Sequence, residues 1–417
     1  MKFIGPIKHP YIFLFSVCLI SRILFKWYSG FDNFELFTDS LRYDMLSDRI
    51  MEGDANMDMV AYLIAPLYPY LIALIKWAFG SHWEGILIAF QFVLVAISSV
   101  YIYKITYLIF KSEGKSLVAG LIYIFYPLTM WYNFTIVQET VFQCFFIFFI
   151  YHFLKSFRKH SKKDIYPAVI FFGLALLTKS HIIILIPIIM VLTFYYSNWK
   201  QVAISLGVLF IMVIPHGIVN YKKHNVFTIS SYGNGSFFLL GNSEYTYDCI
   251  TNPKGEMGKY SKAICDPSSV FDKDFVFGHY GQINLLPHKE RNKKKFEYSI
   301  NWIKSNPQKF IKLKWHGLQR FILPGLDYKV YDFKYWIVSF IAGLLIYIPG
   351  LYFAFQKLKK KELDGLLLFS IYGLCAIIFI VFFPVNRFRV VTLEPFLIIY
   401  ASGFYYNFIK KYYPLGS

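Results

Sequence analysis

Charged residues are scarce in this sequence of 417 residues: only 16% are Asp, Glu, Lys or Arg. Soluble proteins carry about one quarter, so this scarcity, beside 56% hydrophobic residues and 21% aromatics, excludes a chain built of soluble domains. Cysteine is rare as well, with five residues and no CxxC pair. Walker, HExxH and strand-linked GxGxxG motifs do not occur, so nucleotide, zinc and thiol-redox chemistry have little support.

Apolar stretches of about 20 residues, the length that crosses roughly 30 Å of hydrocarbon, recur along most of the chain. We therefore predict an all-α polytopic membrane protein with about ten transmembrane helices plus juxtamembrane helices. The spans are expected at 10–27, 83–103, 117–132, 140–154, 165–179, 182–197, 201–219, 335–355, 364–383 and 390–408.

The formal net charge of +18 raises the question of nucleic acid, but the basic residues lie in short runs between apolar segments. Membrane topology accounts for them better, so we expect no nucleic-acid partner. The positive-inside rule places the short basic links, and with them both termini, in the cytosol. The stretch 65–80 is apolar but short, and a span there would move those links outside. We interpret it as a juxtamembrane helix on the outer face.

The chain divides into three parts. They are an N-terminal transmembrane module (1–219, with a first outer loop at 28–64), an extracytoplasmic loop module (220–334) and C-terminal transmembrane helices (335–417). The loop module starts with alternating apolar residues and turn signals and ends with helical periodicity, which predicts a small mixed α/β fold. Cys249 and Cys265 both lie in it, where an oxidising compartment would allow a disulfide.

Acidic residues crowd the first outer loop. On a helix Asp39 and Tyr43 are four residues apart, as are Asp44 and Asp48, so the pairs lie on adjacent stripes. A carboxylate near a membrane surface can act as a general base toward a hydroxyl, or help to hold a divalent metal beside a phosphate. The alternative is that these acids are solvated or pair with neighbouring arginines.

Further ionisable residues gather at the predicted outer ends of later spans, where such groups usually face one another or a polar cavity. They are Glu139, Lys179, His181, Arg387 and Arg389. Interfacial snorkelling of the basic side chains is the alternative for each one taken alone. Basic groups beside a carboxylate would suit a phosphate leaving group and a nucleophilic hydroxyl, the two partners of glycosyl transfer from a lipid phosphate.

Several short motifs, in this order and spacing, resemble those of the polytopic GT-C glycosyltransferases. The resemblance is to bacterial relatives of the protein mannosyltransferases and of the aminoarabinose transferase that modifies lipid A. The motifs are Thr38-Asp39-Ser40 through Tyr43, Ala65–Pro69 including Tyr68, Gln138-Glu139, Gly173–Ala175 with Leu177–Lys179, Ser230–Asn242, Asn306-Pro307 with Phe310, and Asn386–Arg389.

This resemblance implies a transferase that uses a polyprenyl-phosphate-linked sugar, with Asp39 as the catalytic base. Lys179, Arg387 and Arg389 would grip the lipid phosphate, and Tyr43, Tyr68, His181 and Asn242 are further candidates for substrate binding. The protein mannosyltransferases have an Asp-Glu pair where this chain has Asp39-Ser40, so the role of the second acid is either lost or taken by Asp44. Glu139 matches the family's acid after the third span and is a further catalytic candidate. No metal is required by the resemblance, since many such enzymes need none, but Mg²⁺ or Mn²⁺ could be held through Asp39, Asp44 or Glu139.

We therefore expect inverting transfer at the extracytoplasmic face of a bacterial inner membrane, from undecaprenyl-phosphate-sugar to a hydroxyl in the cell envelope. The acceptor would be a glycolipid, polysaccharide or protein, with lipopolysaccharide and O-antigen among the candidates, and membrane lipids would surround the chain. Two other classes stay open. A transporter or lipid flippase would place its charges near the bilayer midplane, usually between repeated halves. An O-antigen polymerase or ligase would use a diphosphate-linked glycan and an Arg-rich long loop, whereas this loop is mainly Lys-rich.

Overall fold

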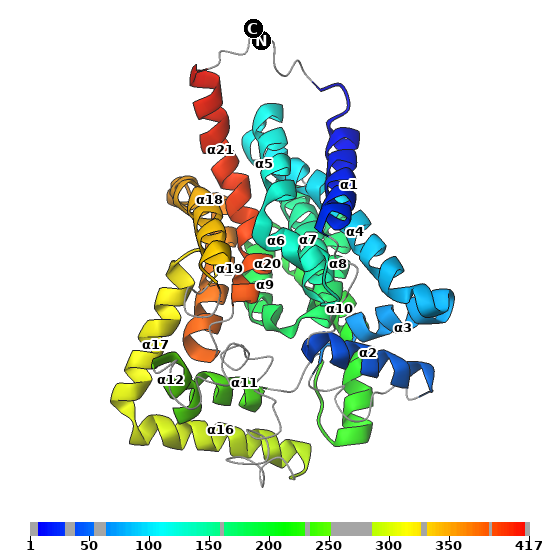
Figure 1. Cartoon of the computed structure of the whole chain (residues 1–417), viewed down its shortest axis with the longest axis vertical. Coiled ribbons are helices and arrows are strands. Elements are labelled where there is room, and N and C mark those ends of the chain that lie inside the picture. Colours follow the sequence, from blue (N-terminus) through cyan, green and yellow to red (C-terminus); the bar gives the residue numbers. More distant parts are fainter. Residues whose placement is uncertain are drawn as a thin grey trace.

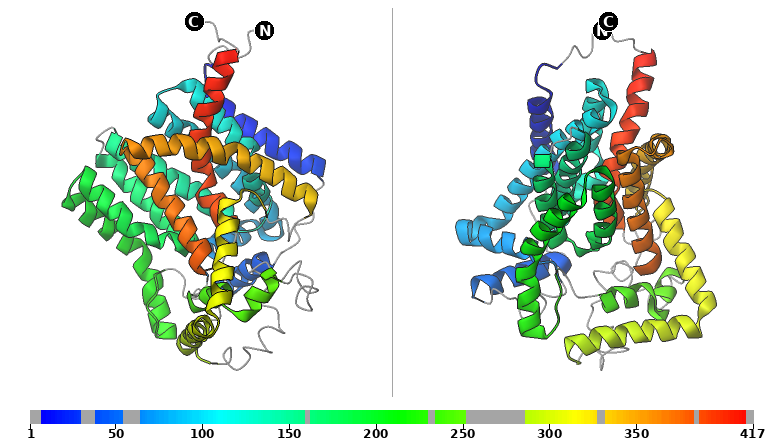
Figure 2. Two further views of the ribbon diagram at one scale, coloured as in Figure 1. Left: turned by 90° about the vertical axis from the view of Figure 1, so that its left-hand side faces the viewer. Right: turned by 180° about the vertical axis from the view of Figure 1, so that it is seen from behind.

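The computed structural model describes residues 7–29, 38–53, 64–158, 162–229, 234–251, 286–326, 332–382 and 386–412 of the chain (Figure 1). Every regular element in these ranges is helical, which confirms the predicted all-α class. Helix α1 begins, and the last helix ends, at the same end of the molecule (Figure 1). Both views in Figure 2 show α2 (Thr38–Met51), α11 (Asn234–Gly241), α12 (Glu244–Thr251) and α16 (His288–Ser305) at the opposite end.

The N-terminal module contains the elements α1 (Pro10–Ser29), α2 (Thr38–Met51), α3 (Leu67–Phe79), η1 (Gly80–His82), α4 (Trp83–Phe110), α5 (Glu113–Phe125), α6 (Pro127–Asn133), α7 (Glu139–Arg158), η2 (Lys162–Asp164), α8 (Ile165–Thr178), η3 (Ser180–Leu185), α9 (Ile186–Tyr196) and α10 (Trp199–His224). Polar caps set two of the helix starts. The Ser112 hydroxyl accepts from the Lys115 backbone N–H at α5, and the Asn198 side chain accepts from that of Gln201 at α10.

The rest of the chain contains α11 (Asn234–Gly241), α12 (Glu244–Thr251), α16 (His288–Ser305), α17 (Pro307–Ile322), α18 (Phe333–Lys359), α19 (Leu363–Ile377), the π-helical turn η4 (Ile378–Phe382), α20 (Asn386–Thr392) and α21 (Glu394–Tyr412). No strand occurs in the described residues of the loop module, so the predicted mixed α/β fold is not found there. Residues 237–240 are apolar in succession rather than alternating, and the helix that contains them packs against α16 and η4. The predicted disulfide lies outside the described residues, because Cys265 falls in 252–285.

Six stretches of the described residues are long and apolar enough to cross a membrane: Pro10–Tyr28, Leu67–Phe110, Glu139–Arg158, Trp199–Lys222, Phe333–Lys359 and Leu363–Phe382. They correspond to six of the ten predicted spans. The other four, at 117–132, 165–179, 182–197 and 390–408, correspond to shorter or divided helices. At 117–132 the division follows from Pro127, because the residue before a proline is disfavoured in helical geometry and Tyr126 is extended.

The predicted juxtamembrane segment 65–80 forms α3, which ends at Gly80. Gly80 has φ +56, a conformation that favours glycine, and η1 then leads into α4. Figure 1 shows α3 beside α2 at the end of the molecule that is remote from the start of α1. That α3 lies along a membrane surface rather than crossing it stays a prediction.

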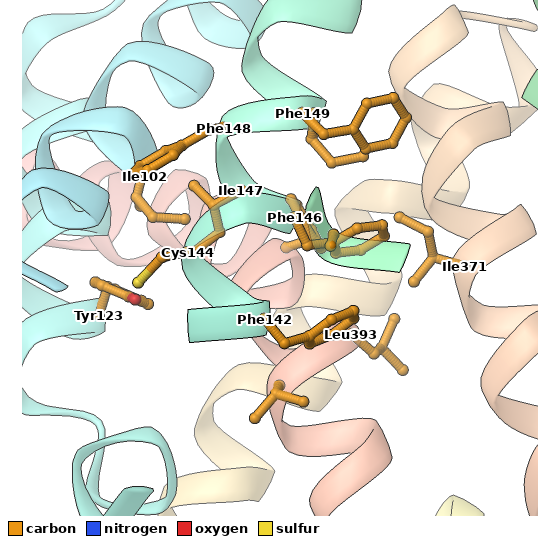
Figure 3. Packing of buried hydrophobic residues seen from close by; sticks show 14 of the residues in the cluster. Ile102, Tyr123, Phe142, Cys144, Phe146, Ile147, Phe148, Phe149, Ile371 and Leu393 are labelled. Atoms are coloured by element: carbon orange, nitrogen blue, oxygen red, sulfur yellow. The ribbon is translucent and has the colours of Figure 1, made fainter. Parts of the chain in front are cut away.

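Helix α7 is the centre of the core, and it contacts α4, α8 and α20. Its phenylalanines are buried on more than one side, because Phe142, Phe146 and Phe149 are each no more than 1% exposed. Figure 3 shows its side chains reaching both Ile102 of α4 and Ile371 of α19. A helix that is apolar all round must be enclosed by other helices. The first residue of α7, Glu139, is therefore held in a fixed place.

Candidate active site

The structure brings together residues from four distant segments at the end of the molecule where α2 lies. Asp39 stands in the first turn of α2 and Arg387 in α20. The Arg387 guanidinium donates from Nη1 to Asp39 Oδ2 at 2.5 Å. Arg42, one turn along α2, lies 3.6 Å from the other carboxylate oxygen. The predicted convergence of Asp39 and Arg387 is therefore present.

A second ion pair lies beside the first. Glu139 begins α7 and Lys179 directly follows α8, and Lys179 Nζ donates to Glu139 Oε1 at 2.7 Å. Their side chains are only 1% and 4% exposed. Arg387 Nε lies 3.7 Å from the same Glu139 oxygen, so it connects the two pairs. We call Asp39, Glu139, Lys179 and Arg387 the charge cluster.

The local field keeps Asp39 ionised. Burial on its own would raise the pKa of the carboxyl, but the charge and hydrogen bond of Arg387, with help from Arg42 and Lys179, lower the pKa of Asp39 below its ordinary value. A carboxylate held in this way is a weak base while the arginine stays paired with it. Any role for Asp39 in proton transfer therefore depends on what happens to Arg387.

Glu139 has one oxygen without a hydrogen-bond partner among the described residues, the buried Oε2. A buried carboxylate oxygen is costly to leave unpaired, and functional sites are where such groups occur. A hydroxyl or another donor on a substrate could satisfy it beside Lys179.

Two tyrosines lie near Asp39: Tyr43 is one turn along α2, and Tyr68 belongs to α3. Tyr43 is 5% exposed, and its ring meets that of Tyr68 edge to face with 5.0 Å between centroids. Burial, and then the nearby charge of Asp39, raise the pKa of Tyr43 well above its usual value, so Tyr43 remains a neutral hydroxyl. Tyr68 is fully buried and donates to Gln91 Oε1 at 3.3 Å. Tyr43 therefore feels the charges of the cluster directly, and the Tyr68 ring packs against the Tyr43 ring.

The sequence reasoning missed a buried polar network beneath the segment that leads to Glu139. Arg22 of α1 is fully buried and donates from Nε to Asn133 Oδ1 at 2.9 Å. Gln91 Nε2 donates to the backbone carbonyls of Asn133 and Thr135. An arginine inside a predicted span was the available signal, because charges at membrane depth are expensive and usually functional.

His181 lies next to the charge cluster but takes part in a different contact. Its Nε2 is 3.2 Å from the Thr392 hydroxyl, and its ring packs against those of Phe142 and Phe388. The Lys179 ammonium lies over the Phe388 ring, 4.7 Å from its centroid. His181 Nδ1 is buried without a hydrogen-bond partner among the described residues, so this nitrogen can still form a hydrogen bond with a substrate.

Arg389 and Asn242, both predicted to bind substrate, are buried and make their hydrogen bonds within the protein, outside the charge cluster. Arg389 is fully buried and donates to Glu394 Oε1 and to the backbone carbonyls of residues 320, 321, 323 and 325. It ties the end of α17 to α20 and α21 and does not face the charge cluster. Asn242 is fully buried and donates to the carbonyls of Phe238 and Val381, which holds α11 against η4.

Asp44 also lies apart from the predicted site. Lys76 of α3 reaches Asp44 Oδ1 and Asp48 Oδ1, each at 2.5 Å, so this pair of acids fastens α2 to α3. The three acids proposed as metal ligands therefore do not form one donor set. Within the described ranges no group of three or more His, Cys, Asp or Glu residues is placed to hold a metal ion.

Comparison with known proteins shows two similarities, one in sequence and one in fold. The family model of dolichyl-phosphate-mannose-protein mannosyltransferase matches residues 64–218. The apo form of the oligosaccharyltransferase of Archaeoglobus fulgidus is similar in fold, with a TM-score of 0.59 at 13% identity over 98% of this chain and 52% of that chain. Archaeal oligosaccharyltransferase AglB from Archaeoglobus fulgidus, in complex with an inhibitory peptide and a dolichol-phosphate, gives 0.56 at 13% identity over 97% and 51%. This chain therefore spans about half the length of the oligosaccharyltransferase.

A crystal structure of ArnT from Cupriavidus metallidurans bound to undecaprenyl phosphate covers 95% of this chain and 78% of that chain at 12% identity, but its TM-score is 0.42. No curated protein matches the sequence. The chain therefore shares its fold with the oligosaccharyltransferase. Residues 64–218 are similar to the dolichyl-phosphate-mannose-protein mannosyltransferases.

Proposed function

We propose that this chain is a membrane glycosyltransferase that moves a sugar from a polyprenyl-phosphate carrier to a hydroxyl group of a cell-envelope acceptor. The observation that carries the proposal is the charge cluster, in which the Asp39–Arg387 and Glu139–Lys179 pairs share Arg387. A carboxylate beside two basic side chains is what transfer from a phosphate needs. One group takes a proton while the others stabilise the charge that develops on the leaving phosphate.

The reaction proposed for this site is a single displacement. The acceptor oxygen attacks the anomeric carbon from the face opposite the phosphate, and the bond between that carbon and the phosphate oxygen breaks with inversion. The acceptor proton passes to the Asp39 carboxylate. The released polyprenyl phosphate carries the electron pair, and Arg387 and Lys179 stabilise it through charge-assisted hydrogen bonds.

Donor binding would activate the base. While Arg387 is paired with Asp39, the pKa of the carboxyl is depressed and the group accepts a proton poorly. A donor phosphate competes for the same guanidinium, and a carboxylate that loses its cation regains basicity. Asp39 would thus become an effective base only when the sugar carrier is in place.

The remaining cluster residues would position these groups. Glu139 contacts both Lys179 and Arg387, so it holds the two phosphate-binding cations at a fixed separation. Tyr43 offers a neutral hydroxyl and an aromatic face next to Asp39, which suits a sugar ring. Tyr68, fully buried behind it, keeps that ring in place.

We further propose that ten segments cross a bacterial inner membrane and that the charge cluster faces the extracytoplasmic side. In support, the basic run of Lys410 and Lys411 ends α21 at the end of the molecule opposite to α2, where the positive-inside rule expects the cytosol (Figure 1). The dolichol-phosphate and peptide in the oligosaccharyltransferase complex support a lipid-phosphate donor here. A glycolipid, a polysaccharide such as O-antigen, or a protein would be the acceptor.

The test is transfer of radiolabelled sugar from synthetic polyprenyl-phosphate sugars to membrane extracts by the purified full chain. Asp39→Asn should reduce transfer by at least about 10²-fold, the scale of general-base catalysis. Asp48→Asn is the matched control, because Asp48 lies on the same helix but pairs with Lys76 and is 55% exposed. Wild-type levels of transfer by Asp39→Asn would disprove its role as base. Absence of transfer by folded wild type with every donor would contradict the enzyme proposal and direct attention to lipid-flux assays.

A further inference from the structure

Two basic side chains on one face of α16 lack an acidic partner. Arg291 donates from Nε and Nη2 to the backbone carbonyl of Leu286, at 3.3 and 3.1 Å. Lys295, one turn further along, donates to the Ser236 hydroxyl of α11 at 3.3 Å. In the part of the chain that the structure describes, no carboxylate pairs with either residue. Lys295 is only 8% exposed, and lysines are almost never so buried unless they are paired.

This arrangement is costly as it stands. Arg291 and Lys295 are four residues apart, so two like charges lie on one stripe of the helix. Burial, reinforced by the Arg291 charge, lowers the pKa of Lys295 to about 8. A bound anion would offset both the repulsion and the desolvation, because buried charges are stable when they are paired.

The two carboxylates of α16 are directed elsewhere, because Glu290 is exposed and Glu297 pairs with lysines on the opposite face. Lys293 and Lys294 lie 3.8 and 3.3 Å from Glu297, and their side chains are 77% and 58% exposed. The acid on this part of the helix therefore neutralises the solvent side, where neutralisation matters least. The buried side keeps two positive charges without one.

The start of α11 completes the site. Asn292 Oδ1 of α16 accepts from the Gly235 backbone N–H at 2.7 Å. A Cβ at Gly235 would come within 2.1 Å of the Asn292 carbonyl oxygen, so only glycine permits this close approach. The approach sets the first turn of α11, with Ser236, against Arg291 and Lys295. The N-terminal end of a helix adds a partial positive charge, which favours an anion.

We propose that Arg291, Lys295 and the Ser236 hydroxyl bind a phosphate group. The planar guanidinium suits two phosphate oxygens, the ammonium supplies a point charge and the hydroxyl can donate a hydrogen bond. A phosphate near pH 7 carries between one and two negative charges, which matches two cations better than a carboxylate does. The site belongs to the group of helices at the α2 end of the molecule (Figure 2).

The phosphate could belong to a soluble compound or to a lipid headgroup, and two probes separate these sources. Radiolabelled inorganic phosphate is one, and short-chain phosphatidylglycerol, used below its micelle concentration, is the other. Each is equilibrated with the purified full chain in detergent, and no sugar donor is present. The result is therefore independent of whether the chain transfers sugar.

Three variants decide the outcome. Arg291→Gln with Lys295→Gln should weaken binding of the preferred probe at least tenfold, whereas Lys293→Gln with Lys294→Gln, which removes the same charge from the exposed face, should not. Lys295→Met keeps the length of the side chain without the buried charge, so it should bind phosphate less tightly yet melt at no lower temperature than wild type. Tighter binding of phosphatidylglycerol would assign the site to a headgroup, and tighter binding of inorganic phosphate to a soluble compound. Failure of wild type to bind either probe, or equal loss in both double variants, would overturn the proposal.

Discussion

The guanidinium of Arg387 lies 2.5 Å from the carboxylate of Asp39, although 348 positions separate the two residues in the chain. The contact joins the first turn of α2 to the first turn of α20, just before the last helix. Glu139 and Lys179 add α7 and the end of α8 to the same cluster. The candidate active site is therefore complete only when the N-terminal and C-terminal modules are folded together.

Removing the Arg387 charge should change both the rate and its pH dependence. Arg387→Gln should lower kcat/KM for the lipid-linked donor by a factor on the order of 10²–10³, the scale for one lost transition-state donor. Because Arg387 depresses the pKa of Asp39, the variant's carboxyl should titrate at higher pH. As the pH is lowered, the variant should therefore lose activity at a higher pH than wild type does, because Asp39 must be ionised to act as the base. A pH profile of kcat/KM measures this shift.

Arg387→Lys is the control for this experiment, because it keeps the positive charge beside Asp39. Its acid limb should stay near that of wild type even if the rate falls through loss of the planar guanidinium. An unshifted acid limb in Arg387→Gln would show that Asp39 is not the titrating base.

The buried Glu139–Lys179 pair should show strong coupling in stability. Glu139→Gln alone leaves a buried ammonium, and Lys179→Met alone leaves a buried carboxylate, so each should cost about 3–5 kcal/mol. The double variant leaves neither charge uncompensated and should be less destabilised than the sum of the single changes. Thermal unfolding of the four proteins in detergent measures this coupling. Additive losses would mean that the two side chains are not paired in the folded protein.

Arg389 should behave as a structural residue, unlike Arg387. Arg389→Gln removes donors from Glu394 and from four backbone carbonyls, so its melting temperature and yield should fall sharply. Protein that remains folded should keep the wild-type KM for the donor. Arg389→Lys should not restore stability, because one ammonium cannot span the same acceptors. A raised KM for the donor in Arg389→Gln, together with normal stability, would show instead that Arg389 binds substrate.

Gly241 should be needed for the close packing of α11 on η4. A Cβ at this position would lie 1.3 Å from the Phe382 carbonyl oxygen, a backbone atom that cannot turn away. Gly241→Ala should therefore displace α11 and lower the melting temperature markedly. Gly207→Ala is the matched control, since nothing lies within 4 Å of its Cβ and alanine favours the helix by up to about 1 kcal/mol. Equal stability of the two variants would contradict the close approach.

Much of the architecture could be predicted from composition and local pattern. Long apolar runs can satisfy their backbone only as helices in a bilayer, so the all-α polytopic class follows from the sequence. The residues that flank each run indicated candidate site residues, because charged side chains are costly inside the membrane and lie at the ends of the spans. Asp39, Glu139, Lys179 and Arg387 were all selected in this way, and the structure brings them into contact.

What the sequence could not determine is the direction in which each polar side chain points. Arg387 and Arg389 are two residues apart on α20, so they leave the helix on roughly opposite sides. Arg387 donates to Asp39, whereas Arg389 points into the core and donates to Glu394. Asp39 and Asp44 are likewise five residues apart on α2, about 140° around the helix, so Asp44 turns to Lys76. Which side faces the site depends on how the helices are rotated against their neighbours, and only tertiary packing fixes that rotation.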